Sequence, residues 1–363
     1  MTQSTAPDGG ITRFEFDANG SLLKLTDPKG RMRRWAYNVR QQVVSATDAL
    51  GRLTQFSYDA VGNVETVTRP DGKVISMTYN AANELIRKNL PALPGVPADV
   101  VDFDFDGMGR LIGMADNDSE IINTFDDASR LIQAEQVFGG NGQAISYGYD
   151  IVSRRTSMTD PTGNTTYGYD SLDRLNSLQD PSARVFGFGY DTISRLTSLT
   201  RNNGVNSTFN YDNASQLLSM VHQKAAVTLA SANYTYNLVG NRNTETREDA
   251  ITRTFGYDGK DRVLTANSSL PANVPNESFN YDLQGNWTVD SRVHNAMDEL
   301  VSDANFTYTY DLLGNLVQKV AAGNPSDVTT YTYNAENRLI GVTTPAVATT
   351  YVYDPIGRRI ARV

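Results

Sequence analysis

An aromatic residue followed directly by Asp or Asn recurs along the whole chain. The commonest step between successive pairs is 21 residues, as from Tyr37 to Tyr58 (58 − 37). A fixed period of this length is typical of repeat architectures, in which each repeat packs on its neighbours. His294-Asn295 has the form of a diverged further copy. The sixteen pairs are Phe16-Asp17, Tyr37-Asn38, Tyr58-Asp59, Tyr79-Asn80, Phe105-Asp106, Phe125-Asp126, Tyr149-Asp150, Tyr169-Asp170, Tyr190-Asp191, Tyr211-Asp212, Tyr236-Asn237, Tyr257-Asp258, Tyr281-Asp282, Tyr310-Asp311, Tyr333-Asn334 and Tyr353-Asp354.

Each pair ends a predicted β-strand and opens a tight turn. A second aromatic stands two residues earlier in most copies, as in Phe56-Ser57-Tyr58, and this alternation puts both rings on one face of a strand. We expect each ring to stack on the equivalent ring of a neighbouring unit. The Asp or Asn is expected to cap the turn by accepting backbone amide hydrogen bonds. A residue that tolerates positive φ follows three positions later, as hairpin turns require: Gly62, Gly109, Ser153, Asp173, Gly240, Gly285, Gly314, Asn337 and Gly357.

An Arg or Asn and then an apolar residue follow the turn, as in Arg195-Leu196, and begin a second strand. That strand ends in its own looser turn, for example Asp27-Pro28-Lys29-Gly30. One unit is therefore strand, tight turn, strand, looser turn. The predicted fold class is all-β: a long antiparallel β-meander of tandem hairpin repeats, curling into an open spiral or shell strip because wide open sheets curl. We expect well over a third of the residues in strands, almost no helix, a flexible N-terminal segment at 1–13 and one array of about 16 units at 14–363.

The motif Tyr-Asp-x-x-Gly-Arg-Leu, clearest at 105–111 and 353–359, resembles that of the YD-repeat, or Rhs, family. The family includes bacterial Rhs polymorphic toxins, the C component of insecticidal toxin complexes, wall-associated proteins and teneurins. The resemblance implies a β-strip that spirals into a hollow shell around a toxin or linker. Many of these shells end in an autoprotease segment with an Asp-Pro-x-Gly-Leu motif. Here Arg358 stands in place of that Leu, so we expect the autoprotease to be absent.

No residue is predicted to be catalytic or to bind a cofactor or metal. Instead we expect a structural repeat signature, in which the aromatic residue packs, the Asp and Gly form the turn, and the Arg pairs with a turn Asp and packs along a ring. Its members are Tyr58, Asp59, Gly62, Phe105, Asp106, Gly109, Arg110, Tyr149, Asp150, Tyr169, Asp170, Arg174, Tyr190, Asp191, Arg195, Tyr211, Asp212, Tyr257, Asp258, Arg262, Tyr281, Asp282, Gly285, Tyr310, Asp311, Gly314, Tyr353, Asp354, Gly357 and Arg358.

Catalytic readings of these residues are less favoured on chemical grounds. The chain has two histidines, His222 and His294, and neither accompanies a nucleophile motif. Copies with Asn in place of Asp suit a turn cap, since Asn cannot act as a general acid or base. Calcium needs several oxygens converging in one loop, which a single carboxylate per repeat does not supply. A weak metal contact stays open at the acidic segments 102–106 and 126–127, and a ligand-binding ladder stays open for the arginines.

Composition restricts the partners. The net charge is -9 with arginines scattered at the repeat spacing, whereas nucleic-acid binders cluster basic residues on one face. There is no Cys, so disulfides and thiolate metal sites are excluded. The N-terminus lacks a signal-peptide pattern, and no apolar run is long enough to span a bilayer.

Two functions stay open from the sequence. The first is a non-enzymatic scaffold, a segment of an Rhs-type shell that encloses a cargo polypeptide of a larger secreted or delivered protein. Its expected partners are the cargo, further shell repeats, and other copies through sheet edges, with no cofactor. The alternative is a cell-surface module that binds a glycan or protein through free aromatic rings. Rings locked between strands favour the scaffold, and rings standing free in a groove favour binding.

Overall fold

The computed structural model describes residues 2–363 and contains strands and turns without helices in that range. Strands make up 57% of the chain, which confirms the predicted all-β class and the expectation of more than one third strand. Contacts divide the chain into two compact units. Unit 1 comprises Met1–Asn123, Glu135–Gly142 and Asn280–Val363, and unit 2 comprises Thr124–Ala134 and Gln143–Phe279.

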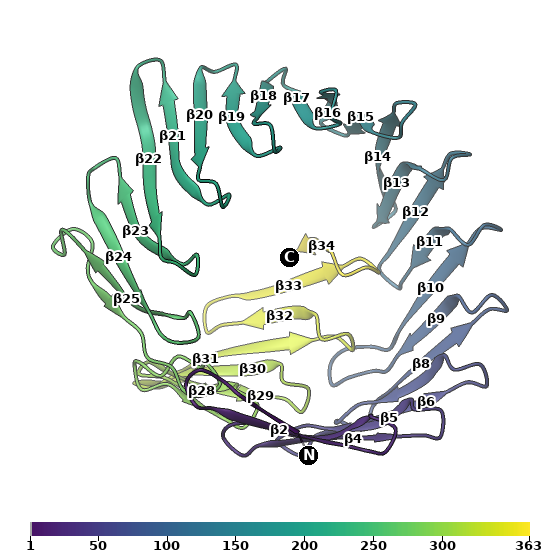
Figure 1. Cartoon of the computed structure of the whole chain (residues 1–363). Coiled ribbons are helices and arrows are strands. Elements are labelled where there is room, and N and C mark those ends of the chain that lie inside the picture. Colours follow the sequence, from purple (N-terminus) through teal and green to yellow (C-terminus); the bar gives the residue numbers. More distant parts are fainter. Residues whose placement is uncertain (1) are drawn as a thin grey trace. The chain divides into compact units, whose positions relative to one another are not determined.

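Unit 1 contains two runs of antiparallel strands, in which each strand pairs with the next along the chain (Figure 1). The first run is β1 (Thr2–Thr5), β2 (Ile11–Phe16), β3 (Leu22–Thr26), β4 (Met32–Tyr37), β5 (Val43–Thr47), β6 (Leu53–Tyr58), β7 (Val64–Thr68), β8 (Val74–Tyr79), β9 (Leu85–Leu90), β10 (Asp99–Phe105) and β11 (Leu111–Ala115). The second run is β27 (Val293–His294), β28 (Leu300–Ser302), β29 (Phe306–Tyr310), β30 (Leu316–Ala321), β31 (Asn324–Tyr333), β32 (Leu339–Thr343), β33 (Ala348–Tyr353) and β34 (Arg359–Arg362).

Unit 2 continues the same hairpin pattern. Its strands are β15 (Arg155–Asp160), β16 (Gly163–Tyr169), β17 (Leu175–Gln179), β18 (Val185–Tyr190), β19 (Leu196–Arg201), β20 (Val205–Tyr211), β21 (Leu217–Lys224), β22 (Val227–Tyr236), β23 (Arg242–Arg247), β24 (Thr252–Tyr257), β25 (Val263–Ser268) and β26 (Glu277–Ser278). Three strands contribute residues to both units: β12 (Ser119–Phe125), β13 (Leu131–Phe138) and β14 (Asn141–Tyr149).

The same turn geometry recurs at the aromatic-Asp pairs. In the β18–β19 hairpin the pairing shifts by one residue between Gly189 and Tyr190, so Tyr190 lies opposite Leu196. Ser194, three residues after Asp191, has a φ of 67°. A type I turn followed by one left-handed residue and a bulge is a common hairpin connection. Gly, Asn, Asp or Ser fills this position in most of the turns, and Gln41 fills it in one; positive φ costs least at Gly and little at Asn or Asp.

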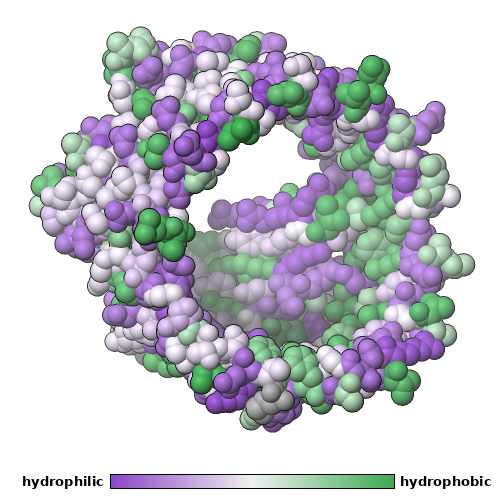
Figure 2. Space-filling model, viewed as in Figure 1, coloured by the Kyte–Doolittle hydropathy of each residue, from purple (hydrophilic) through white to green (hydrophobic). Residues whose placement is uncertain are grey.

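Few side chains are fully buried, since each face of a single sheet is largely open. The buried cluster consists of Leu90, Val101 and Ala335, packed with partly buried Ile75 and Phe103, and it joins the two runs of unit 1. Figure 2 shows hydrophobic residues spread over the visible face in small groups among hydrophilic ones. The most exposed apolar side chains include Val39, Ile151 and Leu238, which lie in the tight turns.

The N-terminal segment begins with a short strand. Residues 2–5 form β1, which pairs with β2 in register from Thr2–Phe14 to Thr5–Ile11. The sequence predicted a flexible segment to residue 13 because 1–13 lacks an aromatic-Asp pair. Backbone hydrogen bonds of a ladder need no particular side chains, so this segment pairs without the repeat motif.

Candidate functional site

Each Asp of the repeat closes its own turn. The Asp191 carboxylate accepts hydrogen bonds from the backbone amides of Ile193 and Arg195, at 3.0 and 2.9 Å. The Arg195 amide bond is the main reason why the pKa of the Asp191 carboxyl lies below its usual range, because hydrogen bonds to the charged form favour it. The corresponding amide four residues on donates to Asp59, Asp106, Asp150, Asp170, Asp212, Asp258, Asp282, Asp311 and Asp354.

The arginine after the turn links its repeat to the next one. Arg174 Nε lies 2.7 Å from Asp170 Oδ2, and Arg174 Nη1 donates to the Asp191 carbonyl at 3.1 Å. The guanidinium lies 4.7 Å from the centre of the Tyr190 ring. This geometry combines an ion pair with a cation–π contact. Equivalent ring contacts are made by Arg130, Arg154 and Arg195, and equivalent ion pairs by Arg110, Arg262 and Arg358.

The predicted stacking of repeat rings on one another is wrong at these repeats, because arginine covers the tyrosine ring. Equivalent rings are two strands apart, or about 10 Å at about 4.8 Å per strand, whereas stacked rings lie about 4.5–7 Å apart. The long Arg174 side chain fills that gap. Ring pairs do occur within one strand, as between Phe14 and Phe16 with centres 6.3 Å apart.

The tyrosine hydroxyl has a role that the sequence reasoning missed. Tyr190 Oη donates to the Leu175 carbonyl at 2.9 Å, at the start of the preceding hairpin's second strand. The preference for Tyr over Phe in most copies was the available signal. The same bond to an earlier carbonyl is made by Tyr37, Tyr58, Tyr79, Tyr149, Tyr169, Tyr211, Tyr236, Tyr257, Tyr310 and Tyr353.

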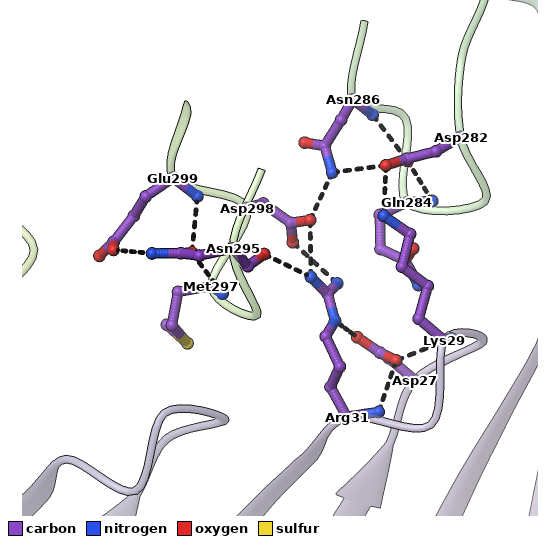
Figure 3. Close-up of polar contacts among 10 residues, drawn as sticks. All are labelled: Asp27, Lys29, Arg31, Asp282, Gln284, Asn286, Asn295, Met297, Asp298 and Glu299. Carbon is purple, nitrogen blue, oxygen red and sulfur yellow. Dashed lines mark hydrogen bonds and ion pairs between the residues drawn. The ribbon is translucent and has the colours of Figure 1, made fainter. Parts of the chain in front are cut away.

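Two rows of turns meet inside unit 1, and we call their contact the seam. One side consists of the looser turns 27–31, 48–52 and 69–71 together with Lys88. The other side consists of tight turns of the C-terminal run, at 282–286, 295–299, 311–315 and 334–338. Figure 3 shows one end of the seam, where Lys29 and Arg31 point toward Asp282 and Asp298.

Charge complementarity holds the seam together. Arg31 Nη1 and Nη2 bind the two Asp298 carboxylate oxygens at 2.8 and 3.0 Å, and Lys29 pairs with Asp282. Further along, Arg52 Nη2 lies 2.8 Å from Glu299 Oε1. Bidentate arginine–carboxylate contacts of this kind are among the stronger polar interactions in proteins. In these cross-row pairs the cation comes from the first row and the carboxylate from the second, and both arginines also bind an Asp of their own turn.

The seam continues past these pairs. Arg69 is 6% exposed and donates to the Ala335 carbonyl at 2.6 Å, and Lys88 pairs with Glu336. At Asp282 and Asp298 burial raises the pKa, but hydrogen bonds from Lys29 and Arg31, respectively, help to lower the pKa below its usual range in both cases. Both carboxylates are thus held ionised against their cationic partners.

The residue four positions after the turn Asp or Asn differs between most seam turns and most turns of unit 2. Most tight turns of unit 2 have Arg four residues after the Asp, as at Asp170 and Arg174, and use it within their own row. In three of the four seam turns this position is Asn286, Glu299 or Asn315, and in the fourth it is Arg338. The two Asn residues and the Glu bind the turn Asp or Asn themselves or face the opposite row.

The other signature residues lie at the repeat positions. Phe105 ends β10 opposite Leu111, and Tyr281 forms an isolated bridge with Trp287. Asp354 is fully buried, and its Oδ2 lies 2.6 Å from Arg358 Nε and 3.2 Å from Gln136 Nε2. Positive φ occurs at Gly62, Gly109, Gly285, Gly314 and Gly357.

The histidines lie in strand contacts. His222 Nδ1 is 2.7 Å from Ser207 Oγ, to which Arg201 donates at 3.0 Å. Ser207 is 1% exposed, so its hydroxyl is not accessible to a substrate in this conformation. His294 lies opposite Leu300 in the β27–β28 pair, in place of a repeat tyrosine.

Three carboxylates of the acidic segments pair with arginines. Asp102 binds Arg87 at 2.6 Å, and Arg110 and Arg130 bind Asp106 and Asp126. Within residues 2–363, no group of three His, Cys, Asp or Glu side chains is placed to hold a metal ion. In the same range no helix is long and apolar enough to cross a membrane.

Comparisons with known proteins match this repeat geometry. The family model described as RHS Repeat matches residues 37–74 and 154–185, and that described as Teneurin YD-shell matches residues 268–363. Double-stranded DNA deaminase toxin A of Burkholderia cenocepacia (strain H111) is 35% identical over 94 residues, which cover 24% of this chain and 6% of that protein.

Solved structures show the same fold. The TcdB2-TccC3-TEV crystal structure superposes with a TM-score of 0.66 at 14% identity, over 94% of this chain and 22% of that one. The Tc holotoxin pore of Photorhabdus luminescens has a TM-score of 0.66 at 12% identity, over 96% of this chain and 23% of that one. The chain thus spans less than a quarter of these proteins. The matched family segments thus identify residues 37–74, 154–185 and 268–363 as similar to RHS and teneurin YD-shell repeats, and the chain as a whole shares the fold of these toxin shell proteins.

Proposed function

We propose that the chain is a segment of an Rhs-type β-shell whose wall encloses a toxin or other cargo polypeptide of a larger secreted or delivered protein. A structural shell role agrees with the matched families. The observation that carries the proposal is the seam. It joins two rows of repeats edge to edge through ion pairs such as Arg31–Asp298, and a wall higher than one strip needs this kind of junction.

The position of the rings favours the scaffold over the alternative, a module that binds glycan or protein. Tyr190 is held by its hydroxyl to Leu175 and covered by Arg174. A ring whose hydroxyl is bonded and one of whose faces is covered by a guanidinium presents less free surface to a ligand.

We further propose that the chain acts without catalysis and that its partners are a cargo polypeptide and further shell repeats. The relative named as a DNA deaminase toxin shares a segment with this chain, which supports a toxin as parent. Asp354 belongs to an ordinary repeat turn bound to Arg358, and this supports the absence of the autoprotease. We also propose that residues 14–363 form a single repeat array and that the parent protein is delivered outside the cell.

Limited proteolysis of the protein encoded by the intact gene tests enclosure. We expect the cargo polypeptide of the parent protein to resist protease until the repeats are unfolded by urea. The double variant Arg31→Ala/Arg52→Ala should expose it at lower urea, because it opens the seam. Arg184→Ala is the matched control, since Arg184 pairs with Asp180 in a similar turn but is 67% exposed. Equal digestion of the cargo in native and urea-unfolded protein would overturn the proposal.

A further inference from the structure

A cavity in unit 1 lies beside an insertion in the repeat. The step from Tyr79 to Phe105 is 26 residues (105 − 79), whereas the commonest step is 21. The additional residues belong to a loop at 91–98, between β9 and β10. Residues of this loop, of the turn at 116–118 and of strands β32 and β33 line a cavity of about 290 Å³. Sites for small molecules begin at about this size.

Hydrogen bonds hold the inserted loop in place as one wall of the cavity. Leu93 and Val96 exchange two backbone hydrogen bonds of 2.9 Å, which close the loop on itself. The Asn117 amide donates to Asp99 Oδ1 at 3.1 Å, and Asn117 Nδ2 donates to the Ala98 carbonyl at 3.2 Å. The loop is therefore tied to the neighbouring turn, and the cavity does not depend on a ligand to form it.

Apolar and aromatic side chains form a large part of the lining. Leu90 and Ala335, which belong to the buried cluster, line the cavity together with Tyr351 and Tyr353 of β33. The Tyr353 hydroxyl donates to the Leu339 carbonyl at 2.8 Å. The Tyr351 hydroxyl forms no hydrogen bond within residues 2–363. The cavity thus suits a ligand with an apolar body, and it offers that ligand one uncommitted hydroxyl.

Three carboxylates line the same cavity, those of Asp99, Asp116 and Asp118. None of them forms an ion pair with another residue of the described chain. Burial raises the pKa of the Asp116 and Asp118 carboxyls, and the negative charge of Asp99 also raises both pKa values. Arg338 lines the cavity as well, but its Nη2 lies 2.8 Å from Glu336 Oε2. A cation bound in the cavity would offset the repulsion among the three carboxylates.

We propose that this cavity binds an organic cation, an ammonium or guanidinium group carried on an apolar stem or ring. The charged group lies against the three carboxylates, and the apolar body lies against the tyrosine-lined wall, since carboxylates and aromatic rings both attract such cations. Within residues 2–363 no group of three acidic or histidine side chains is placed to hold a metal ion, which favours an organic cation. The cavity binds this ligand whether or not the wall encloses a cargo.

NMR titration of the full isotope-labelled chain at pH 7 tests this site. The probe is phenethylamine, and the comparison compound is 2-phenylethanol, which has a neutral hydroxyl in place of the ammonium group. We expect phenethylamine to shift the amide signals of Asn117, Asp118 and Tyr351. The alcohol should bind at least about tenfold more weakly, equivalent to about 1.4 kcal/mol, because it has no charge to place against the carboxylates.

A third compound distinguishes the two sources of such a cation, a free amine and a basic side chain of a polypeptide. N-acetyl-lysine N-methylamide carries the ammonium group on an alkyl stem between two peptide bonds. Tighter binding of phenethylamine assigns the cavity to a free aromatic amine. Tighter binding of the blocked lysine assigns it to a polypeptide side chain. Both results support a site for an organic cation.

Two variants of the chain assign the binding to this cavity. Asp118→Asn removes one of the three charges at an exposed position and should weaken the amine about threefold or more. Asp327→Asn makes the same change at an exposed position of β31, away from the cavity, and should leave binding unchanged. Equal binding of amine and alcohol, equal effects of the two variants, or no shift at Asn117 and Tyr351 would overturn the proposal. Spectra of each variant without ligand establish that it is folded.

Discussion

Arg52 Nη2 lies 2.8 Å from Glu299 Oε1, across 247 positions of sequence. The same guanidinium binds Asp48 through Nε at 2.5 Å, so one side chain connects its own turn to a turn of the opposite row. The side chains of Arg52 and Glu299 are 9% and 13% exposed. A charge pair this well covered loses more when one partner is removed than a surface pair does.

Arg52→Ala is expected to lower the free energy of unfolding by about 2–3 kcal/mol, because Glu299 and Asp48 each lose a charged partner. Urea denaturation followed by circular dichroism measures the change. Arg184→Ala, at an exposed turn pair, should cost less than about 1 kcal/mol. Equal losses for the two variants would show that the seam adds no stability.

Two substitutions at Tyr190 distinguish the contribution of its ring to stability from that of its hydroxyl. Tyr190→Phe removes the bond to the Leu175 carbonyl and should cost about 1 kcal/mol. Tyr190→Ala also removes the ring on which Arg174 packs and should cost roughly 3 kcal/mol or more. The urea midpoints of the two variants check this order. A Phe variant as unstable as the Ala variant would assign the effect to the hydroxyl alone.

Asp191 should tolerate Asn better than Ala. Asp191→Asn keeps a side-chain oxygen that accepts the amides of Ile193 and Arg195, as Asn80 does for Ala82 and Glu84. Asp191→Ala removes the cap entirely. We expect the urea midpoint to fall little for Asn and clearly for Ala, with both falling less than for Tyr190→Ala. A larger loss for Asn than for Ala would contradict the capping role.

Acid should weaken the repeats and the seam together. The pKa values of Asp191, Asp282 and Asp298 lie below the ordinary 3.8 in the folded chain. Each contribution is therefore full above the unfolded pKa and is lost as pH falls through the folded pKa. Urea midpoints should stay level from pH 7 to about 5 and fall below about 4. Rising stability on acidification in that window would contradict the assignment.

His222→Ala should affect stability alone. Ser207 would lose one partner and keep Arg201, at a cost of about 1–2 kcal/mol. Any activity of the parent protein, measured at equal folded fraction, should be unchanged. Loss of a hydrolytic activity in a folded His222→Ala protein would show that the histidine is catalytic.

The sequence by itself determined the local parts of the fold. Asp191 and Arg195 are four residues apart, and the cap, the left-handed Ser194 and the bulge at Tyr190 all follow from side-chain size and backbone preference within that span. The tight turns then require an antiparallel meander. Each turn reverses the chain, so each strand pairs with the strand that follows it.

Only the tertiary structure decided which turns meet. Arg31 and Asp298 are separated by 267 positions, and no local preference selects that partner over another carboxylate. The sequence predicted that the repeat arginine packs along a ring, but which ring Arg174 covers, that of Tyr190 in the next hairpin, depends on the spacing between alternate strands. Which distant segments form ion pairs and ring contacts depends on the total curvature and twist of the sheet. That total adds up from the small angle between each strand and the next, and a repeating sequence does not specify it.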